Sequence, residues 1–304
     1  MDYVREAKGI FSRFGVAYAA FLLVGTMAQV EVTFIAQLIA SFSGKTVELN
    51  SMLLFLMSMP MYVVGAPISW LLVKDLPTPC RLQENRLPFR QFLIFFCISI
   101  SVMYIGNYIG LALMSIVNGI QGKPPMNPVN DIVESLDTWM IFILMVVMAP
   151  LFEELLYRKL LIDRICQFGD KTAILMSGIL FGLSHGNFYQ FFYAFGLGVI
   201  FAYIYLNTGR LRYTIALHAI VNFMGSIVAL YVAENQVVMN VYGVFLLVAM
   251  ILGIVFLFKF RRRLVILPAY VEIPKGRQFQ TLFLNIGMVL FFLVSLGLFL
   301  ISGI

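Results

Sequence analysis

Residues 241–258 read VYGVFLLVAMILGIVFLF, a run of 18 residues without one charged side chain. A run of about 18 or more apolar residues predicts a helix that spans a membrane. The whole chain agrees with this stretch, because 61% of its residues are hydrophobic and 12% are charged, against about 45–50% and about 25% in soluble domains. A soluble fold cannot bury so much apolar surface, since its exterior must contact water.

The apolar runs are also too continuous for a membrane β-barrel, whose strands alternate apolar and polar residues over about ten positions. Within lipid every backbone N–H and C=O needs a partner from the protein, which leaves helices as the remaining choice. We therefore predict an all-α fold, a polytopic transmembrane helical bundle, with residues 1–304 forming one membrane domain.

Hydrophobicity predicts about nine spans, and the polar residues of greatest interest fall in spans four to seven. The fifth predicted span is short, and Gly186–Asn187 links it tightly to the sixth. We expect this pair to form a helical hairpin whose tip stops within the membrane. The predicted spans are residues 14–42, 51–73, 91–117, 139–160, 171–186, 188–206, 213–233, 239–258 and 281–303.

The basic residues alternate with these spans. Cytoplasmic loops of membrane proteins carry an excess of Lys and Arg. Of the 21 Lys and Arg residues, 19 fall on one side of the nine-span arrangement, and only Lys45 and Lys123 fall on the other. This split predicts an integral, multi-pass protein of the cell membrane, with its N-terminus in the cytoplasm and its C-terminus outside. The basic residues are spread among loops, so the net charge of +6 does not indicate nucleic-acid binding.

The three cysteines, Cys80, Cys97 and Cys166, show no paired spacing. Cys97 lies in an apolar run, where a buried thiol is the ordinary expectation. We therefore expect neither a disulfide nor a cysteine metal site.

Adjacent carboxylates interrupt the fourth predicted span, which reads APLFEELLYR over residues 149–158. Glu153 and Glu154 point about 100° apart on a helix. Glu154 and Arg158 have the i, i+4 spacing that brings side chains together, so this pair would hold Glu154 and leave Glu153 free to act as a base. An ion pair at the end of a helix is the plain alternative. Ionisable groups within spans are costly and mark functional sites by default.

Both histidines of the chain also lie in apolar helical sequence. His185 ends the segment FGLSH, in which Phe181 is one turn earlier, and His218 begins HAIVN, in which Asn222 is one turn later. Taken singly, a buried histidine is more often a satisfied core residue than a catalyst. The set of a carboxylate, two imidazoles and an amide suits the activation of a water and the stabilisation of an oxyanion.

These three short motifs, at residues 153–158, 181–185 and 218–222, resemble in order and spacing the signature of the CPBP family. That family comprises type II CAAX prenyl endopeptidases and the bacteriocin-processing, Abi-type intramembrane proteases. The resemblance covers residues 136–230, which would form a CPBP-like catalytic core. One departure is Lys159, where many relatives have Gly after the arginine.

The resemblance implies hydrolysis of a peptide bond within or beside the membrane. By carry-over, Glu153 activates the water, His185 helps to hold it, and His218 and Asn222 stabilise the oxyanion. The residues with supporting roles would be Glu154, Arg158 and Phe181.

A metal is one open alternative, since Glu153, His185 and His218 would make a plausible zinc triad. The family has been described both as metalloproteases and as glutamate-type proteases. The asparagine at the site and the lack of an extended zinc motif favour chemistry without a metal, so we expect no cofactor, with zinc as the alternative.

The function classes that remain open differ in what the polar groups do. The favoured function is an endopeptidase that acts on a membrane-associated peptide or protein and takes no nucleic acid. An ion- or proton-coupled transporter could use the same groups as an ion path, although it would predict repeat-related broken helices, which the sequence does not show. A non-catalytic immunity or scaffold protein is the third class.

We expect the site to be a cavity open toward the cytoplasm.

Overall fold

The computed structural model describes residues 2–43, 51–79, 82–122, 127, 133 and 135–303, and every regular element in these ranges is helical. This confirms the all-α prediction. The elements are α1 (Asp2–Ser43), α2 (Ser51–Pro60), η1 (Met61–Gly65), α3 (Ala66–Val73), α4 (Phe89–Gln121), α6 (Thr138–Ile141), η2 (Phe142–Met148), α7 (Ala149–Glu154), η3 (Leu155–Leu160), α8 (Leu161–Ile165), η4 (Cys166–Phe168), α9 (Asp170–Leu183), α10 (Phe188–Thr208), α11 (Leu211–Phe223), η5 (Met224–Val228), α12 (Ala229–Ala233), α13 (Gln236–Phe260), η6 (Arg261–Arg263), η7 (Lys275–Arg277), α14 (Gln278–Leu282) and α15 (Ile286–Ile301).

Seven helical columns in the described ranges are long and apolar enough to cross a membrane, and the bent pair of α14 and α15 makes an eighth. Helix α9, at the position of the fifth predicted span, has only 14 residues, whereas a complete span needs about 20. The polytopic helical bundle is therefore confirmed. The predicted number of nine exceeds the seven candidate spans by the short helix α9 and by the bent pair of α14 and α15, which counts as one span only if its two helices are taken together.

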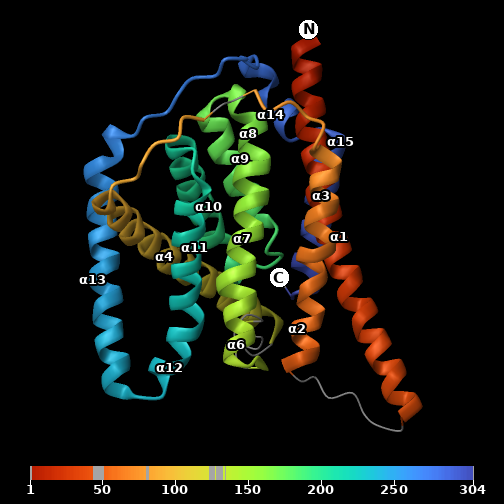
Figure 1. The fold of residues 1–304 in the computed structure, drawn as a ribbon, viewed down its shortest axis with the longest axis vertical. Helices are drawn as coiled ribbons and strands as arrows, with labels where there is room; N and C mark the ends of the chain where they lie inside the picture. The colour runs from red at the N-terminus through yellow and green to blue at the C-terminus, as the bar shows by residue number, and fades with distance from the viewer. Residues whose placement is uncertain are drawn as a thin grey trace.

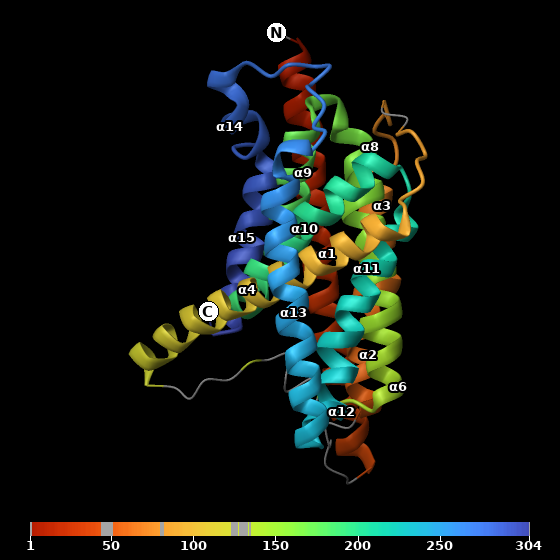
Figure 2. The same cartoon turned by 90° about the vertical axis from the view of Figure 1, so that its left-hand side faces the viewer.

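The helices form a bundle around a central column that runs from α6 through η2, α7 and η3 to α8 (Figure 1). Helix α1 packs against α15 and against the column of α2, η1 and α3, while α10 packs between α9 and α4, and α4 also contacts α13 (Figures 1 and 2). Helix α11 lies against η2 and α7 of the central column. The motif-bearing segments α7, α9 and α11 are thus close to one another.

Helices α9 and α10 form the expected hairpin, and its sequence explains both its close packing and its turn. A Cβ on Gly198 would lie 2.9 Å from the Cα of Gly178, so these glycines allow the two helices to touch. At the tip, Gly186 has a φ of +65°, which favours glycine, and the Asn187 side chain accepts a hydrogen bond from the Gln190 N–H to cap α10.

The tip of this hairpin meets the end of the last helix. The Ser302 hydroxyl donates to the carbonyl of Gly186 at 2.8 Å, and Figures 1 and 2 place the C-terminal end midway along the molecule. Helix α9 is about 21 Å long, from the rise per residue. The hairpin therefore turns inside the bundle, as its short length predicts.

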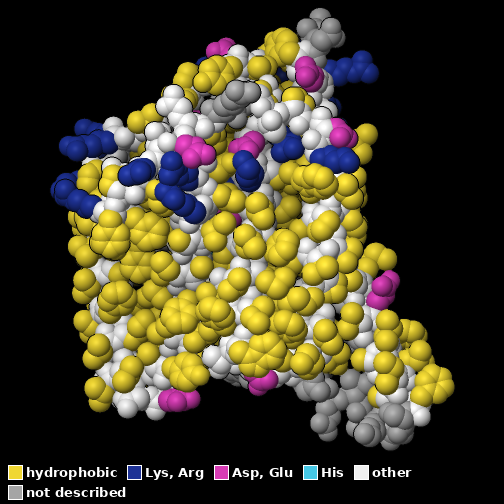
Figure 3. All heavy atoms as spheres, viewed as in Figure 1, with side chains coloured by type: hydrophobic (Ala, Val, Ile, Leu, Met, Phe, Trp, Pro, Cys, Tyr) yellow, Lys and Arg dark blue, Asp and Glu magenta, His cyan; other side chains and the backbone are white. Residues whose placement is uncertain are grey.

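Charge is distributed unevenly over the surface. Figure 3 shows Lys and Arg side chains gathered at one end of the molecule, above a broad apolar band. Large apolar side chains are exposed along this band, for example Val244, Leu293 and Phe34. An exposed apolar band of this extent fits a lipid environment.

One expectation about cysteines is wrong, because Cys166 is disulfide-bonded. Cysteines far apart in a chain can be joined when the fold brings their loops together, and sequence spacing gives no sign of this. Cys97 is free, as expected.

Candidate active site

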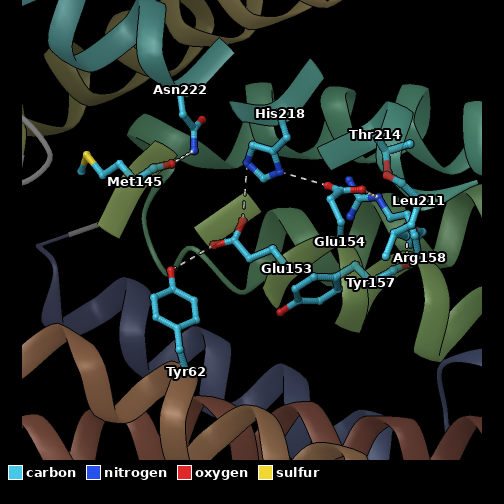
Figure 4. Close-up of polar contacts among 11 residues, drawn as sticks. Tyr62, Met145, Glu153, Glu154, Tyr157, Arg158, Leu211, Thr214, His218 and Asn222 are labelled. Atoms are coloured by element: carbon cyan, nitrogen blue, oxygen red, sulfur yellow. Dashed lines mark hydrogen bonds and ion pairs between the residues drawn. The ribbon is translucent and has the colours of Figure 1, made fainter. Parts of the chain in front are cut away.

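Glu154 is the buried member of the carboxylate pair and has a partner on each oxygen (Figure 4). Its Oε2 lies 3.0 Å from Nε of Arg158, and both side chains are 0% exposed. Its Oε1 accepts a hydrogen bond from Nδ1 of His218 at 2.9 Å. The predicted i, i+4 pair is therefore present, and it also fixes the imidazole of the third motif.

The Arg158 guanidinium is held by charge and by aromatic rings. It lies 4.6 Å from the ring centroid of Phe181 and 5.5 Å from that of Phe201. Within the described residues, none of its nitrogens has a hydrogen bond of good geometry, although Nε is close to Glu154. Arginine over an aromatic face gains cation–π stabilisation in such a desolvated site. Phe181 also meets the His218 ring edge to face at 5.7 Å, so it packs against both partners of Glu154.

Glu153 points away from this buried pair and is the more exposed carboxylate, at 16%. Its Oε2 lies 3.7 Å from Nε2 of His218, and the Tyr62 hydroxyl donates to its Oε1 at 3.4 Å. His218 thus stands between the two carboxylates, with one ring nitrogen toward each (Figure 4).

His185 lies at the tip of the α9–α10 hairpin and is half-buried. Its Nδ1 is 2.8 Å from the carbonyl oxygen of Phe181. A carbonyl can only accept, so Nδ1 carries the proton and Nε2 of the neutral ring is the acceptor. Next to it, Tyr157 donates to Ser184 Oγ at 2.6 Å, which ties the hairpin to the central column.

Asn222 is one turn beyond His218 on the same face of α11, but its amide already has a partner. Its Nδ2 donates to the carbonyl of Met145 in η2 at 2.8 Å. An amide nitrogen has two hydrogens, so one remains for another acceptor. This bond also joins α11 to the central column.

The helices depart from α-geometry around these side chains. Four π-helical segments surround the site: η1 carries Tyr62, η2 carries Met145, η3 carries Tyr157 and Arg158, and η5 follows Asn222. Single-turn π segments in α-helices are frequent at functional sites. Each one changes the direction of the side chains that follow it, so the π segments help three columns to direct side chains toward one cavity.

The four predicted catalytic residues line one cavity of about 560 Å³, together with Phe181. Glu154 and Arg158 lie behind its wall and not on it. The structure therefore brings Glu153, His185, His218 and Asn222 together, as the sequence predicts.

The cavity extends along part of the bundle. Its described lining includes residues of α2, of η5 and of the turn before α6, elements that lie toward the end of the bundle away from the Lys and Arg side chains. The expected opening of the cavity toward the cytoplasm stays a prediction.

Sequence reasoning missed several polar residues of the cavity wall, among them Tyr62, Tyr157 and Ser184. Tyr62 lies far from the motifs in the chain, and no spacing rule connects it with them. Tyr157 and Ser184 fall inside two motifs, at positions that read as ordinary apolar or small helical residues.

The metal alternative involves Glu153, His185 and His218. Among the described residues, no group of three or more His, Cys, Asp or Glu side chains is placed to hold a metal ion. His218 Nδ1 is bonded to Glu154, and its Nε2 lies 3.7 Å from Oε2 of Glu153, close to the separation of two ligand atoms on one zinc ion with bonds of about 2.0–2.2 Å. Zinc thus stays an alternative to chemistry without a metal.

Comparison with known proteins connects this geometry with a family. The family model described as "Type II CAAX prenyl endopeptidase Rce1-like" matches residues 135–224, which include every motif of the site. The chain is also 24% identical over 192 residues to the membrane-embedded CAAX protease MroQ of Staphylococcus aureus, a match that covers 60% of this chain and 75% of that protein. Residues 135–224 of the chain are thus similar to the type II CAAX prenyl endopeptidases. No solved structure matches the chain.

Both comparisons support the general activity of a membrane-embedded protease, the hydrolysis of a peptide bond in a peptide or protein. The matched segment contains α7, α9 and α11, the three elements that carry the site.

Proposed function

We propose that this protein is a member of the CPBP family and an intramembrane endopeptidase of the glutamate type, which cleaves a membrane-associated peptide or protein with a water activated by Glu153. One observation carries the proposal. Glu153 is the single carboxylate among the described residues of the cavity wall, and it lies 3.7 Å from His218 Nε2. A base beside an imidazole in a cavity suits general-base hydrolysis.

In the first step, a water between Glu153 and His185 attacks the carbonyl carbon of the scissile bond. Glu153 takes one proton of this water, and the neutral His185 accepts a hydrogen bond from the other through Nε2. The C–O bond forms as the carbonyl electrons move to oxygen, which gives a tetrahedral oxyanion. Holding the water in this position lowers the entropic part of the barrier.

In the second step, the oxyanion collapses and the C–N bond breaks. The free hydrogen of the Asn222 amide and the Nε2–H of a doubly protonated His218 stabilise the oxyanion beforehand. Glu154 balances the charge of that imidazolium, because it is bonded to Nδ1. Glu153 passes its proton to the leaving amine, which returns the carboxylate to its initial state.

The proposal involves no metal, because the asparagine at the site suits the stabilisation of an oxyanion and the sequence has no extended zinc motif. It leaves open whether the substrate is prenylated or is an unmodified precursor or leader peptide. We further propose that the basic end of the bundle and the N-terminus lie in the cytoplasm and that the protein resides in the cell membrane, since 19 of 21 Lys and Arg residues fall on that side of the predicted spans.

The test is cleavage of a membrane peptide by the purified protein in detergent. Glu153→Gln keeps the shape of the side chain and removes its basicity, so it should abolish turnover while the protein still folds. Glu234→Gln, at an exposed position after α12, is the matched control and should cleave normally. Full turnover by Glu153→Gln would refute the mechanism. Loss of activity with strong chelators would replace it by the metal version.

The same variants separate the proposal from the transporter alternative. Proton flux in liposomes that depends on Glu153, without cleavage of any membrane peptide by the unmodified protein, would favour a transporter. A phenotype in cells that is unaffected by Glu153→Gln would favour the non-catalytic scaffold.

A further inference from the structure

A tyrosine from outside the family motifs reaches the proposed base. Tyr62 belongs to η1, in the column formed by α2, η1 and α3, and its side chain points into the cavity toward Glu153 (Figure 4). We propose that Tyr62 is a positioning residue of the hydrolytic reaction, whose hydroxyl holds one oxygen of Glu153 so that the other faces the water. This inference rests on the proposed function.

The contacts of the carboxylate support this role. Tyr62 donates to Oε1 of Glu153, while Oε2 faces His218. A free carboxylate rotates and exchanges its two oxygens. A donor on one oxygen and an imidazole beside the other, supplied by different helices, define which oxygen takes the proton of the water.

The ring of Tyr62 is placed independently of its hydroxyl. It stacks on Phe152, the residue before Glu153, at 5.4 Å between centroids and 29° between planes. The backbone at Tyr62 is π-helical and follows Pro60. Removing only the hydroxyl should therefore leave the ring and the cavity wall where they are.

The length of the contact points to catalysis and not to support of the fold. At 3.4 Å it is longer than the 2.5–3.0 Å of an ordinary O–H···O bond. Catalytic hydrogen bonds are often long in a ligand-free enzyme and shorten in the complex with substrate. Such a bond contributes little to the folding stability of the ligand-free protein. It contributes more to stabilisation of the transition state, in which Glu153 must keep its orientation as it takes the proton.

The test compares Tyr62→Phe with the unmodified protein in the detergent cleavage assay. We expect kcat to fall about 10- to 100-fold, the range for loss of a hydrogen bond to a charged group, with KM within about twofold and an unchanged thermal midpoint. Replacing Tyr62 by 4-aminophenylalanine keeps the ring and a donor, and should bring kcat back to within about threefold of the unmodified protein.

The matched control is Tyr205→Phe, because Tyr205 also donates to a carboxylate, Asp163 Oδ1 at 2.8 Å, but lies outside the cavity. It should leave kcat unchanged. A second comparison uses Glu153→Asp, whose shorter carboxylate lies beyond the reach of Tyr62. In that background, Tyr62→Phe should change the residual kcat by less than about twofold.

Three outcomes would overturn the inference: an unchanged kcat in Tyr62→Phe, an effect confined to KM, or an equal loss of kcat in the Glu153→Asp background. These are distinct from failure of the proposed function. If Glu153→Gln is fully active, the mechanism itself fails. If Glu153→Gln is inactive and Tyr62→Phe is normal, only the role of Tyr62 is wrong.

Discussion

Replacing Arg158 by methionine tests the buried ion pair on which the site rests. Methionine keeps a long apolar side chain under the Phe181 ring but removes the charge opposite Glu154. Both members of the pair are 0% exposed, so the remaining carboxylate would be buried without its counter-charge. Breaking one side of a buried pair typically costs about 3–5 kcal/mol of folding free energy. We expect Arg158→Met to lose stability in that range.

The double variant separates loss of the pair from loss of packing. Glu154→Gln keeps an oxygen that can accept from His218 Nδ1, and it removes the unpaired charge. Arg158→Met combined with Glu154→Gln should therefore regain at least ~2 kcal/mol relative to Arg158→Met alone, because two matched neutral groups avoid the cost of one buried ion.

The assay is the thermal midpoint of each purified variant in detergent, followed by size-exclusion chromatography. A loss of about 3–5 kcal/mol corresponds to a fall on the order of 10 °C for a chain of this size. Arg212→Met, which removes an exposed arginine next to Tyr213, is the control and should stay within about 1–2 °C of the unmodified protein. A normal midpoint for Arg158→Met, or a double variant that shows the simple sum of the single losses, would refute the reasoning.

Three further predictions address the oxyanion, the hairpin and the orientation. Asn222→Ala should lower kcat by about 10²–10³-fold, the usual cost of one oxyanion donor, and a normal rate in the cleavage assay would exclude that role. Gly186→Ala should reduce both stability and activity, because the backbone has a φ of +65° and a new Cβ would lie 2.9 Å from Cβ of Leu298; an unaltered thermal midpoint would contradict it. Single cysteines in place of Arg262 and Glu234 should label from opposite sides of intact cells, with position 262 accessible only after permeabilisation; the reverse pattern would invert the proposed topology.

The class of fold could be predicted because it depends on composition and on the length of apolar runs, both of which are visible in the chain. The site could be found because its ionisable residues are rare in such sequence: the two histidines and the adjacent Glu153 and Glu154 have few rivals within the spans. The i, i+4 pairing of Glu154 with Arg158 is local and follows from helix geometry.

What could not be predicted depends on contacts between distant segments. Tyr62 reaches Glu153 across 91 positions of sequence, and nothing in its own neighbourhood marks it. The excess in the number of spans has a simple cause, since α9 is apolar enough to be counted but only 14 residues long.

The π-helical turns around the site have a consequence for how the chain can change. A π turn contains one residue more than the α-helical turn it replaces, so each of η1, η2, η3 and η5 behaves as a built-in insertion. Deleting one residue from η2 would rewind it to an α-helical turn, and the parts of the column on either side would keep nearly their present directions. A deletion in a neighbouring α-helical turn would instead rotate one part by about 100° relative to Glu153. Homologues should therefore be aligned here by allowing one-residue gaps within helices, and single-residue deletions in the π turns should be less harmful than deletions in the α-helical turns beside them.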